Sequence, residues 1–374
     1  MRRFRVRRGI AATAVALAAV LGAGGWAAGT QSAVTGPPPG SAAWTADTAL
    51  GLRLPDPATT TPAGIAAFFG ALTPAQQDAL ATRHPLVVGN LDGAPVELRY
   101  RANALALTAE RTRELARATD PALTPEDHRA ARTRAERYRT LLDGGRHVLA
   151  FDPRGRGQVA EVFGDLATAR RTAVVVPGSD TDLQSFDRAG DPYGTAAGMA
   201  RALHGATGGQ TAVIAWAGYT TPVGLGPDAA TEDLARAGAT RLTRLLDGLA
   251  VSTRPQAPPT VFCHSYGSVV CGLARPGPAR ASGLVVLGSP GMGVDSGADL
   301  DPGVPLWATA RNGSDWIGDV PHVRLLGLGH GADPTAPGFG ARPVPATGSH
   351  GHSGYFAPGT ASLAAYAAIA LGRG

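Results

Sequence analysis

Short β-branched segments alternate with helical stretches from residue 146 to the end of the chain, and this alternation is the strongest constraint on the fold. The predicted strands are bounded by Gly, Pro or Asp and span 147–152, 158–163, 172–176, 212–217, 260–263, 283–287 and 305–310. The predicted helices span 228–249, 267–274 and 362–371. Strands separated by helices form a mostly parallel sheet covered on both faces. The sequence therefore predicts an α/β core, with a doubly wound sheet, over residues 146–374.

The preceding residues, 61–145, have a helical pattern. Thr73 before Pro74 and Thr124 before Pro125 each combine an N-cap residue with a proline in the first helical turn. Another helix is predicted over 101–118, and a turn over 90–93. Residues 34–60, whose first part is rich in Pro, Gly, Ser and Ala, are predicted to be a linker. We expect a helical N-terminal region that packs on the α/β core.

Residues 1–33 have the layout of a secretory signal peptide. Arginines fill five of the first eight positions, an uncharged stretch spans 9–25, and small residues follow as far as Ala33. The alternative is an uncleaved membrane anchor, although a stretch rich in Ala and Gly at the short end of the spanning range favours the signal. Both alternatives place the folded part outside the cytoplasm, secreted or at the cell surface. Membrane contact is expected only if this segment is not cleaved.

The net charge of +5 is carried by the same five N-terminal arginines, because the first acidic residue is Asp47. The rest of the chain is formally neutral and has no basic stripe interleaved with aromatic residues, which argues against binding to nucleic acid. The two cysteines, Cys263 and Cys271, are too few for a metal cage. They form a disulfide in an oxidising compartment, or they remain two buried thiols.

The residues around Ser265 join an apolar strand to the start of a helix. Residues 261–270 read VFCHSYGSVV. A nucleophile elbow places its Ser at such a turn, with Gly two residues before and two after. Gly267 keeps the second of these positions, whereas Cys263 replaces the first. Ser265 is therefore the predicted nucleophile, and the alternative is a buried Ser at an ordinary strand–helix junction.

The catalytic partners of such a serine follow it in the order acid and then histidine. Asp315, after the predicted strand 305–310, is the predicted acid, with Asp319 in reserve. His352, in a polar Gly-rich loop, is the predicted base, with His350 as the second choice. The imidazole would take the hydroxyl proton of the serine, and the aspartate would orient it. The other histidines near these segments, His264, His322 and His330, are predicted to be structural or solvated.

Two backbone N–H groups are predicted to bind the oxyanion. One belongs to Tyr266, directly after the nucleophile at the helix N-terminus. The other comes from the loop after the third strand of the core, where Ser179 is favoured over Gly178, and the alternative is a plain turn. Trp216 and Tyr219 follow the next strand, and they line the substrate pocket or belong to the core.

Three parts of the chain resemble a family of actinobacterial α/β-hydrolase-fold proteins that was defined as a domain of unknown function. The likeness lies in residues 84–95 with Arg99 and Asn103, in 264–268 with 288–291, and in 330–334, 339–341 and 352–355. The resemblance implies a serine-hydrolase fold, esterase- or lipase-like, with a helical N-terminal region. It implies no defined substrate.

Together these observations predict an exported serine hydrolase that cleaves an ester, less readily an amide or thioester, through an acyl-enzyme at Ser265. Its substrate is a small-molecule or cell-envelope ester, and acyl transfer would use the same residues. No cofactor and no metal are expected. The alternative is a non-catalytic envelope protein that keeps the fold as a binding or scaffold module. A metallohydrolase using His350 and His352 has the least support, because no carboxylate partner or helical spacing completes a ligand set.

Overall fold

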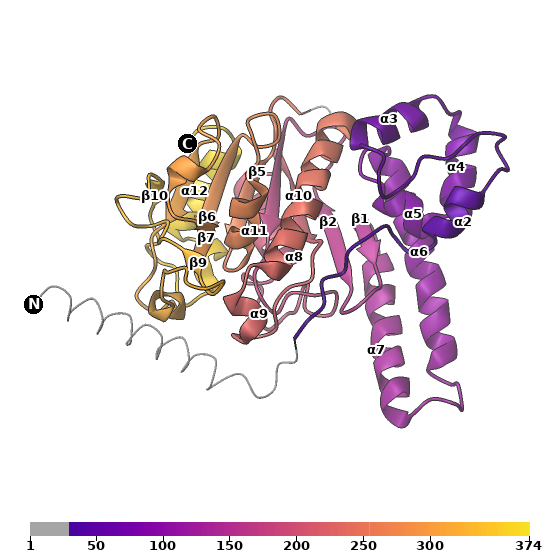
Figure 1. Ribbon diagram of the computed structural model, residues 1–374, viewed down its shortest axis with the longest axis horizontal. Coiled ribbons are helices and arrows are strands. Elements are labelled where there is room, and N and C mark those ends of the chain that lie inside the picture. The colour runs from indigo at the N-terminus through magenta and orange to yellow at the C-terminus, as the bar shows by residue number, and fades with distance from the viewer. Residues whose placement is uncertain (1–29, 254) are drawn as a thin grey trace, which may run out of the picture.

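The computed structural model describes residues 30–253 and 255–374 and is built around an eight-stranded sheet (Figure 1). The strand order is β1-β2-β4-β3-β5-β6-β8-β10. The strands are β1 (His147–Asp152), β2 (Gln158–Phe163), β3 (Arg171–Val176), β4 (Thr211–Ala217), β5 (Thr260–His264), β6 (Gly283–Leu287), β8 (Leu306–Thr309) and β10 (Arg342–Val344). β2 pairs antiparallel with β1 and β4, and the other neighbours are parallel. The predicted α/β class with a mostly parallel sheet is confirmed.

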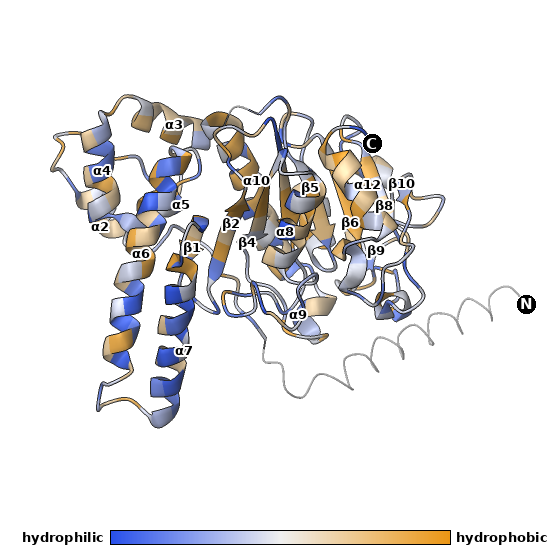
Figure 2. Ribbon diagram, turned by 180° about the vertical axis from the view of Figure 1, so that it is seen from behind, coloured by the Kyte–Doolittle hydropathy of each residue, from blue (hydrophilic) through white to orange (hydrophobic). Residues whose placement is uncertain are grey.

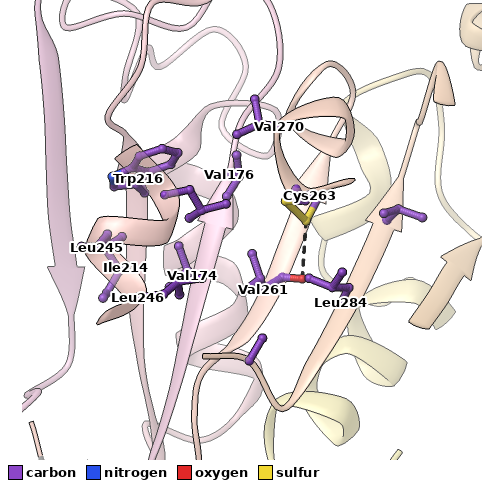
Figure 3. Close-up of a cluster of buried hydrophobic side chains, with 14 of the residues drawn as sticks. Val174, Val176, Ile214, Trp216, Leu245, Leu246, Val261, Cys263, Val270 and Leu284 are labelled. Carbon is purple, nitrogen blue, oxygen red and sulfur yellow. Dashed lines mark hydrogen bonds between the residues drawn. A yellow bond between two sulfur atoms is a disulfide. The ribbon is translucent and has the colours of Figure 1, made fainter. Parts of the chain in front are cut away.

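Helices cover both faces of this sheet. In β3, Val174 and Val176 belong to one core cluster, whereas Ala173 and Val175 belong to the other, because successive side chains of a strand point to opposite faces. The first cluster packs against α10 (Asp233–Ser252) and α11 (Gly267–Ala274), as Figure 3 shows for Leu245 and Leu246. The second packs against α8 (Ala196–Ala206) and α12 (Ala361–Ala370). Burial on both faces explains why the central strands are apolar throughout.

The N-terminal region is helical, as expected. It contains α2 (Ser41–Ala46), α3 (Pro62–Gly70), α4 (Pro74–Arg83), α5 (Pro85–Asn90), α6 (Val96–Arg117) and α7 (Pro125–Leu142). Thr73 and Thr124 cap α4 and α7 with reciprocal capping boxes. The long pair α6 and α7 projects from the body, and Figure 2 shows its far half to be mostly hydrophilic. The near half packs against β1.

The segment 34–60 is not the open linker that its composition predicts. It contains α2, and the Trp44 side chain is fully buried among residues of α3 to α6. The Trp44 Nε1–H donates to the Pro55 carbonyl at 2.7 Å. Trp44 and Leu54, both buried in the same cluster, anchor the segment to the helical region.

Several smaller elements depart from the expected pattern. α8 was not predicted, and the helix expected over 228–249 is divided into α9 (Pro227–Ala230) and α10. A separate two-stranded sheet joins β7 (Gly291–Val294) to β9 (His330–Gly331). Most of the predicted signal segment 1–33 lies outside the described residues. Within the described part of the chain, no helix has both the length and the apolar character to cross a bilayer.

Candidate active site

Ser265 occupies a strained turn between β5 and α11. Its φ is 55°, in the left-handed region that a residue with a Cβ adopts only at an energetic cost. The Ser265 N–H donates to the Leu287 carbonyl of β6 at 3.0 Å, and the Ser268 hydroxyl donates to the Ser265 carbonyl. A Cβ on Gly267 would lie 2.4 Å from the Val176 carbonyl oxygen, so only glycine allows β3 to approach this closely. These contacts hold the turn that an elbow requires.

Cys263, the departure from the usual elbow, forms a disulfide with Cys271. Cys263 lies on β5, two residues before Ser265, and Cys271 lies on α11. Both side chains are fully buried in the same core cluster, in which Figure 3 labels Cys263. A side chain at this position points toward the helix that follows the turn, and here the two sulfur atoms fill the space between strand and helix. The disulfide therefore joins the two arms of the elbow covalently.

Removing this disulfide should lower stability. The bond closes a short loop with a sequence separation of 8, for which loop closure corresponds to about 2.5 kcal/mol. We expect the double variant Cys263→Ala/Cys271→Ala to lose about 2–3 kcal/mol of unfolding free energy in urea titrations. Reduced and oxidised wild type should differ in the same direction. Two thiols that react with an alkylating agent in the folded protein without reduction would contradict the assignment.

Asp315 follows β8 and has a fully buried carboxylate. Its Oδ1 accepts from His352 Nδ1 at 2.8 Å and from the Ile317 N–H at 3.0 Å, and its Oδ2 accepts from the Tyr355 hydroxyl at 2.5 Å. Burial raises the pKa of Asp315, but the hydrogen bonds from His352 and Tyr355 outweigh it and hold the pKa below its usual value. The carboxylate is therefore ionised at neutral pH. Asp319, the reserve acid, is exposed.

His352 lies against Asp315 and the elbow. Because Nδ1–H donates to the carboxylate, the lone pair of a neutral ring is on Nε2. That atom is buried and has no hydrogen-bond partner among the described residues. A Cβ on Gly288 would lie 2.9 Å from His352 Cε1, and Gly288 directly follows the residue that accepts from the Ser265 N–H. The imidazole thus lies against Gly288, next to the strand end that binds the Ser265 N–H, but in the described residues Nε2 forms no hydrogen bond with the Ser265 hydroxyl. Catalytic hydrogen bonds are often long in enzymes without bound substrate and shorten when it binds.

Two neighbouring rings and one hydrogen bond fix the orientation of His352. His264 Nε2–H donates to the His352 carbonyl at 2.9 Å, and the two rings are 4.7 Å apart. Burial lowers the pKa of His264 to about 3, and a proton on His352 would act in the same direction, so this ring stays neutral. Trp316 lies on His352 with a ring separation of 4.6 Å. His350, the second choice of base, is exposed.

Tyr355 and Trp316 are site residues that the sequence analysis did not assign. Tyr355 is fully buried and donates to a carboxylate 40 positions earlier in the chain. Its only sequence signal was its place in the segment 352–355, one of those that resemble the hydrolase family. Trp316 gave no signal beyond its position next to Asp315.

The loop after β3 touches the nucleophile. A Cβ on Gly178 would lie 2.9 Å from Ser265 Oγ and 3.0 Å from the Tyr266 nitrogen. In the described part of the chain, the N–H groups of Tyr266, Gly178 and Ser179 have no recorded hydrogen-bond acceptor. The Tyr219 hydroxyl donates to the Pro177 carbonyl at 2.7 Å and supports this loop. The loop after β3 and the backbone nitrogen of Tyr266 therefore lie beside the Ser265 hydroxyl.

A small apolar pocket of about 80 Å³ opens at Ser265. Its walls include Ser179 and Tyr266, and its apolar lining comes from Leu225, Ala229, Ala230, Pro290, Trp316, Ile317, Val320 and Pro321. His330 also lines it, with its ring edge-on to Tyr266 and its Nε2 bonded to the Ala229 carbonyl. In residues 30–253 and 255–374, no group of three or more His, Cys, Asp or Glu side chains is arranged to hold a metal ion.

Comparison with known proteins gives a family match over the core. A family described as Alpha/beta hydrolase matches residues 152–325. The uncharacterized protein Rv2079 of Mycobacterium tuberculosis is 30% identical over an alignment of 379 residues, which covers 86% of this chain and 57% of that protein. The uncharacterized protein Rv0963c of the same species is 33% identical over 171 residues, which covers 44% of this chain and 64% of that protein. The chain thus spans little more than half the length of the first of these relatives.

One solved structure, a 2,6-dihydroxy-pseudo-oxynicotine hydrolase, is similar at 13% identity with a TM-score of 0.31, over 70% of this chain and 74% of that one. The family match over residues 152–325 and the sheet order β1-β2-β4-β3-β5-β6-β8-β10 agree on an α/β-hydrolase fold for the core of the chain.

Proposed function

We propose that the protein is an exported serine hydrolase that cleaves carboxylic esters with short acyl groups. The observation that carries this proposal is the vacant Nε2 of His352, on a ring oriented by the buried Asp315 carboxylate and set against the strained turn of Ser265. Nine buried side-chain N and O atoms lack a partner in the described residues, and His352 Nε2 differs from the others in its ring, which is oriented by a buried carboxylate beside the turn of Ser265. A general base needs such a free lone pair to accept the proton of the nucleophile.

The same residues account for each proton in the reaction. His352 Nε2 accepts the hydroxyl proton as Ser265 Oγ attacks the ester carbonyl, and the Asp315 carboxylate stabilises the imidazolium that results. The N–H groups of Tyr266 and Ser179 bind the oxyanion. His352 then returns the proton to the leaving alcohol. Water attacks the acyl-enzyme with His352 again as base, which releases the carboxylic acid and restores Ser265.

The size of the pocket supports short acyl groups. Its volume of about 80 Å³ corresponds to two or three water molecules, well below the volumes of sites that hold drug-sized ligands. Its lining is almost entirely apolar. An acyl chain of a few carbons would fill it, and a longer chain would leave methylene groups in water.

The chain-length profile tests this assignment. We expect kcat/KM for nitrophenyl butyrate to exceed that for nitrophenyl decanoate by at least about tenfold, because methylene groups beyond those that fill the pocket gain no burial, and a longer chain forced into it displaces the pocket walls at a cost of about 1–3 kcal/mol. Val320→Ala enlarges the pocket and should move the optimum toward longer chains. Val251→Ala, at an exposed position on α10, should leave the profile unchanged. A flat profile, or no hydrolysis of any chain length by folded protein, would contradict the proposal.

A further inference from the structure

A second cavity, of about 300 Å³, lies between the helical N-terminal region and the α/β core. Its walls come from α5, α6, β1, β2, β4 and α10, with segments 35–38 and 57–58 (Figure 1). Within the described residues, its lining has no member in common with that of the pocket at Ser265. Its volume is at the lower end of the range for small-molecule sites. The cavity is therefore separate from the candidate active site and large enough for a ligand.

The lining of this cavity is rich in charge. The charged side chains are Asp92, Arg99, Asp152, Arg154, Arg241 and Arg244. The two carboxylates are already engaged, because Asp92 pairs with Arg99 at 3.0 Å and Asp152 pairs with Arg154 at 2.6 Å. Four guanidinium groups against two carboxylates leave an excess of positive charge.

Of the four arginines that line this cavity, Arg241 forms no direct ion pair in the described residues, although the charges of Asp152 and Asp92 also act on it. The Arg241 Nε–H donates to the Gly218 carbonyl at 2.6 Å. Desolvation lowers the pKa of Arg241 below its ordinary value, yet a guanidinium stays protonated in proteins. A partly buried guanidinium that faces a cavity favours a carboxylate or phosphate there, because these anions accept two parallel hydrogen bonds from its planar fork.

Gln158 gives a second, independent indication of a ligand. This residue is 4% exposed and lies at the start of β2, where it lines the same cavity. Both polar atoms of its side-chain amide are buried without a hydrogen-bond partner among the described residues. An amide left in this state costs free energy. A ligand with both an acceptor and a donor, or with an acceptor and bridging water, would remove that cost.

The segment 84–95, which carries part of the family resemblance, builds one wall of the cavity. Asn90 binds β1 through its amide, which donates to the Phe151 carbonyl at 2.7 Å and accepts from the Phe151 N–H at 3.2 Å. Asp92 holds Arg99, whose Nε–H also donates to the Gly89 carbonyl. The proposed catalytic steps use none of these residues. Their contacts hold this wall in place. None of these contacts uses the Arg241 guanidinium or the Gln158 amide, so both groups can contact a ligand.

We propose that this cavity is a binding site for a small organic anion, with its carboxylate or phosphate group at Arg241 and Gln158. The apolar part of the ligand would lie against Phe151, Trp216 and Leu245, which also line the cavity. The proposed site does not involve Ser265, so it can be correct even if the proposed ester hydrolysis is wrong, and the reverse also holds.

Calorimetric titration of the full-length protein tests the site. The probes are benzoate, phenyl phosphate and inorganic phosphate, with neutral benzamide as the uncharged control. We expect saturable 1:1 binding of at least one anion, and no comparable binding of benzamide. Arg241→Met keeps most of the side-chain volume and should weaken binding at least about tenfold, as loss of a charge-assisted contact does. Arg236→Met, at an exposed position on the same helix, and Ser265→Ala should bind the anion as wild type does.

A second variant keeps the test independent of the choice of probe. Gln158→Met replaces the unpartnered amide by an apolar group of similar size. We expect it to raise the Tm of the ligand-free protein by about 1–3 °C, because a buried polar group without a partner is removed, and to weaken anion binding. The proposal is overturned by a lower Tm of Gln158→Met, by anion affinity that Arg241→Met leaves unchanged, or by no binding of any of the three anions.

Discussion

Replacing Ser265 by alanine should lower kcat for nitrophenyl butyrate by at least about 10⁴-fold. The acyl-enzyme cannot form without the hydroxyl, and what remains is catalysis by the oxyanion donors and by substrate binding alone. KM should change little, because the small hydroxyl contributes mainly to the reacting state. Steady-state kinetics on purified protein with matched circular-dichroism spectra measure both quantities.

The control for this substitution is Ser296→Ala. Ser296 caps a short 3-10 helix after β7 and does not line the pocket at Ser265. It should retain wild-type kcat. If Ser265→Ala keeps more than a tenth of the wild-type rate, the reaction does not pass through this hydroxyl, and the scaffold alternative gains support.

Replacing His352 by alanine should lower kcat by at least about a hundredfold, as expected for the loss of a general base. The effect should not add to that of Ser265→Ala, because the two side chains act as one unit, so the double variant should resemble Ser265→Ala. Burst kinetics distinguish the acylation step, which requires proton removal from the serine, from the later hydrolysis of the acyl-enzyme.

His350→Ala is the matched control, since it removes an exposed imidazole two positions away. It should leave kcat within about twofold of wild type, because substitutions at exposed positions away from the site have small effects. A large loss in His350→Ala and none in His352→Ala would show that the base is assigned to the wrong residue.

Seven of the eight strands of the core sheet were predictable because each consists of apolar and β-branched residues between turn residues, and the structure shifts their ends by no more than one residue. The eighth, β10, was not predicted. α8 was missed although its buried residues and its polar Arg201 and His204 lie on different faces, because glycines within AAGMARALHGA weaken the prediction of a helix. β7 contains two glycines with positive φ, a conformation that no strand pattern predicts. The packing of segment 34–60 depends on where Trp44 is buried, which is a tertiary property.

The candidate site shows the same difference between features that depend on local sequence and features that depend on contacts between distant segments. Ser265 was predictable because the elbow is local, with its strand, turn and glycine within a few residues. Asp315 and His352 were predicted from their order along the chain and from the loops in which they lie. The sequence could therefore rank them above Asp319 and His350, but it could not give the distance between the two side chains. Tyr355 and the cavity at Arg241 were beyond sequence reasoning, since each depends on contacts between segments far apart in the chain.

The central claim is that Ser265 is a nucleophile activated by His352, and a fluorophosphonate probe tests it most directly. The probe phosphonylates a serine only where a base and oxyanion donors act on its hydroxyl. We expect a single adduct per chain, mapped by mass spectrometry to the peptide that carries Ser265, and we expect Ser265→Ala to lose it. Folded wild-type protein that stays unlabelled, or an adduct on another residue, would contradict it.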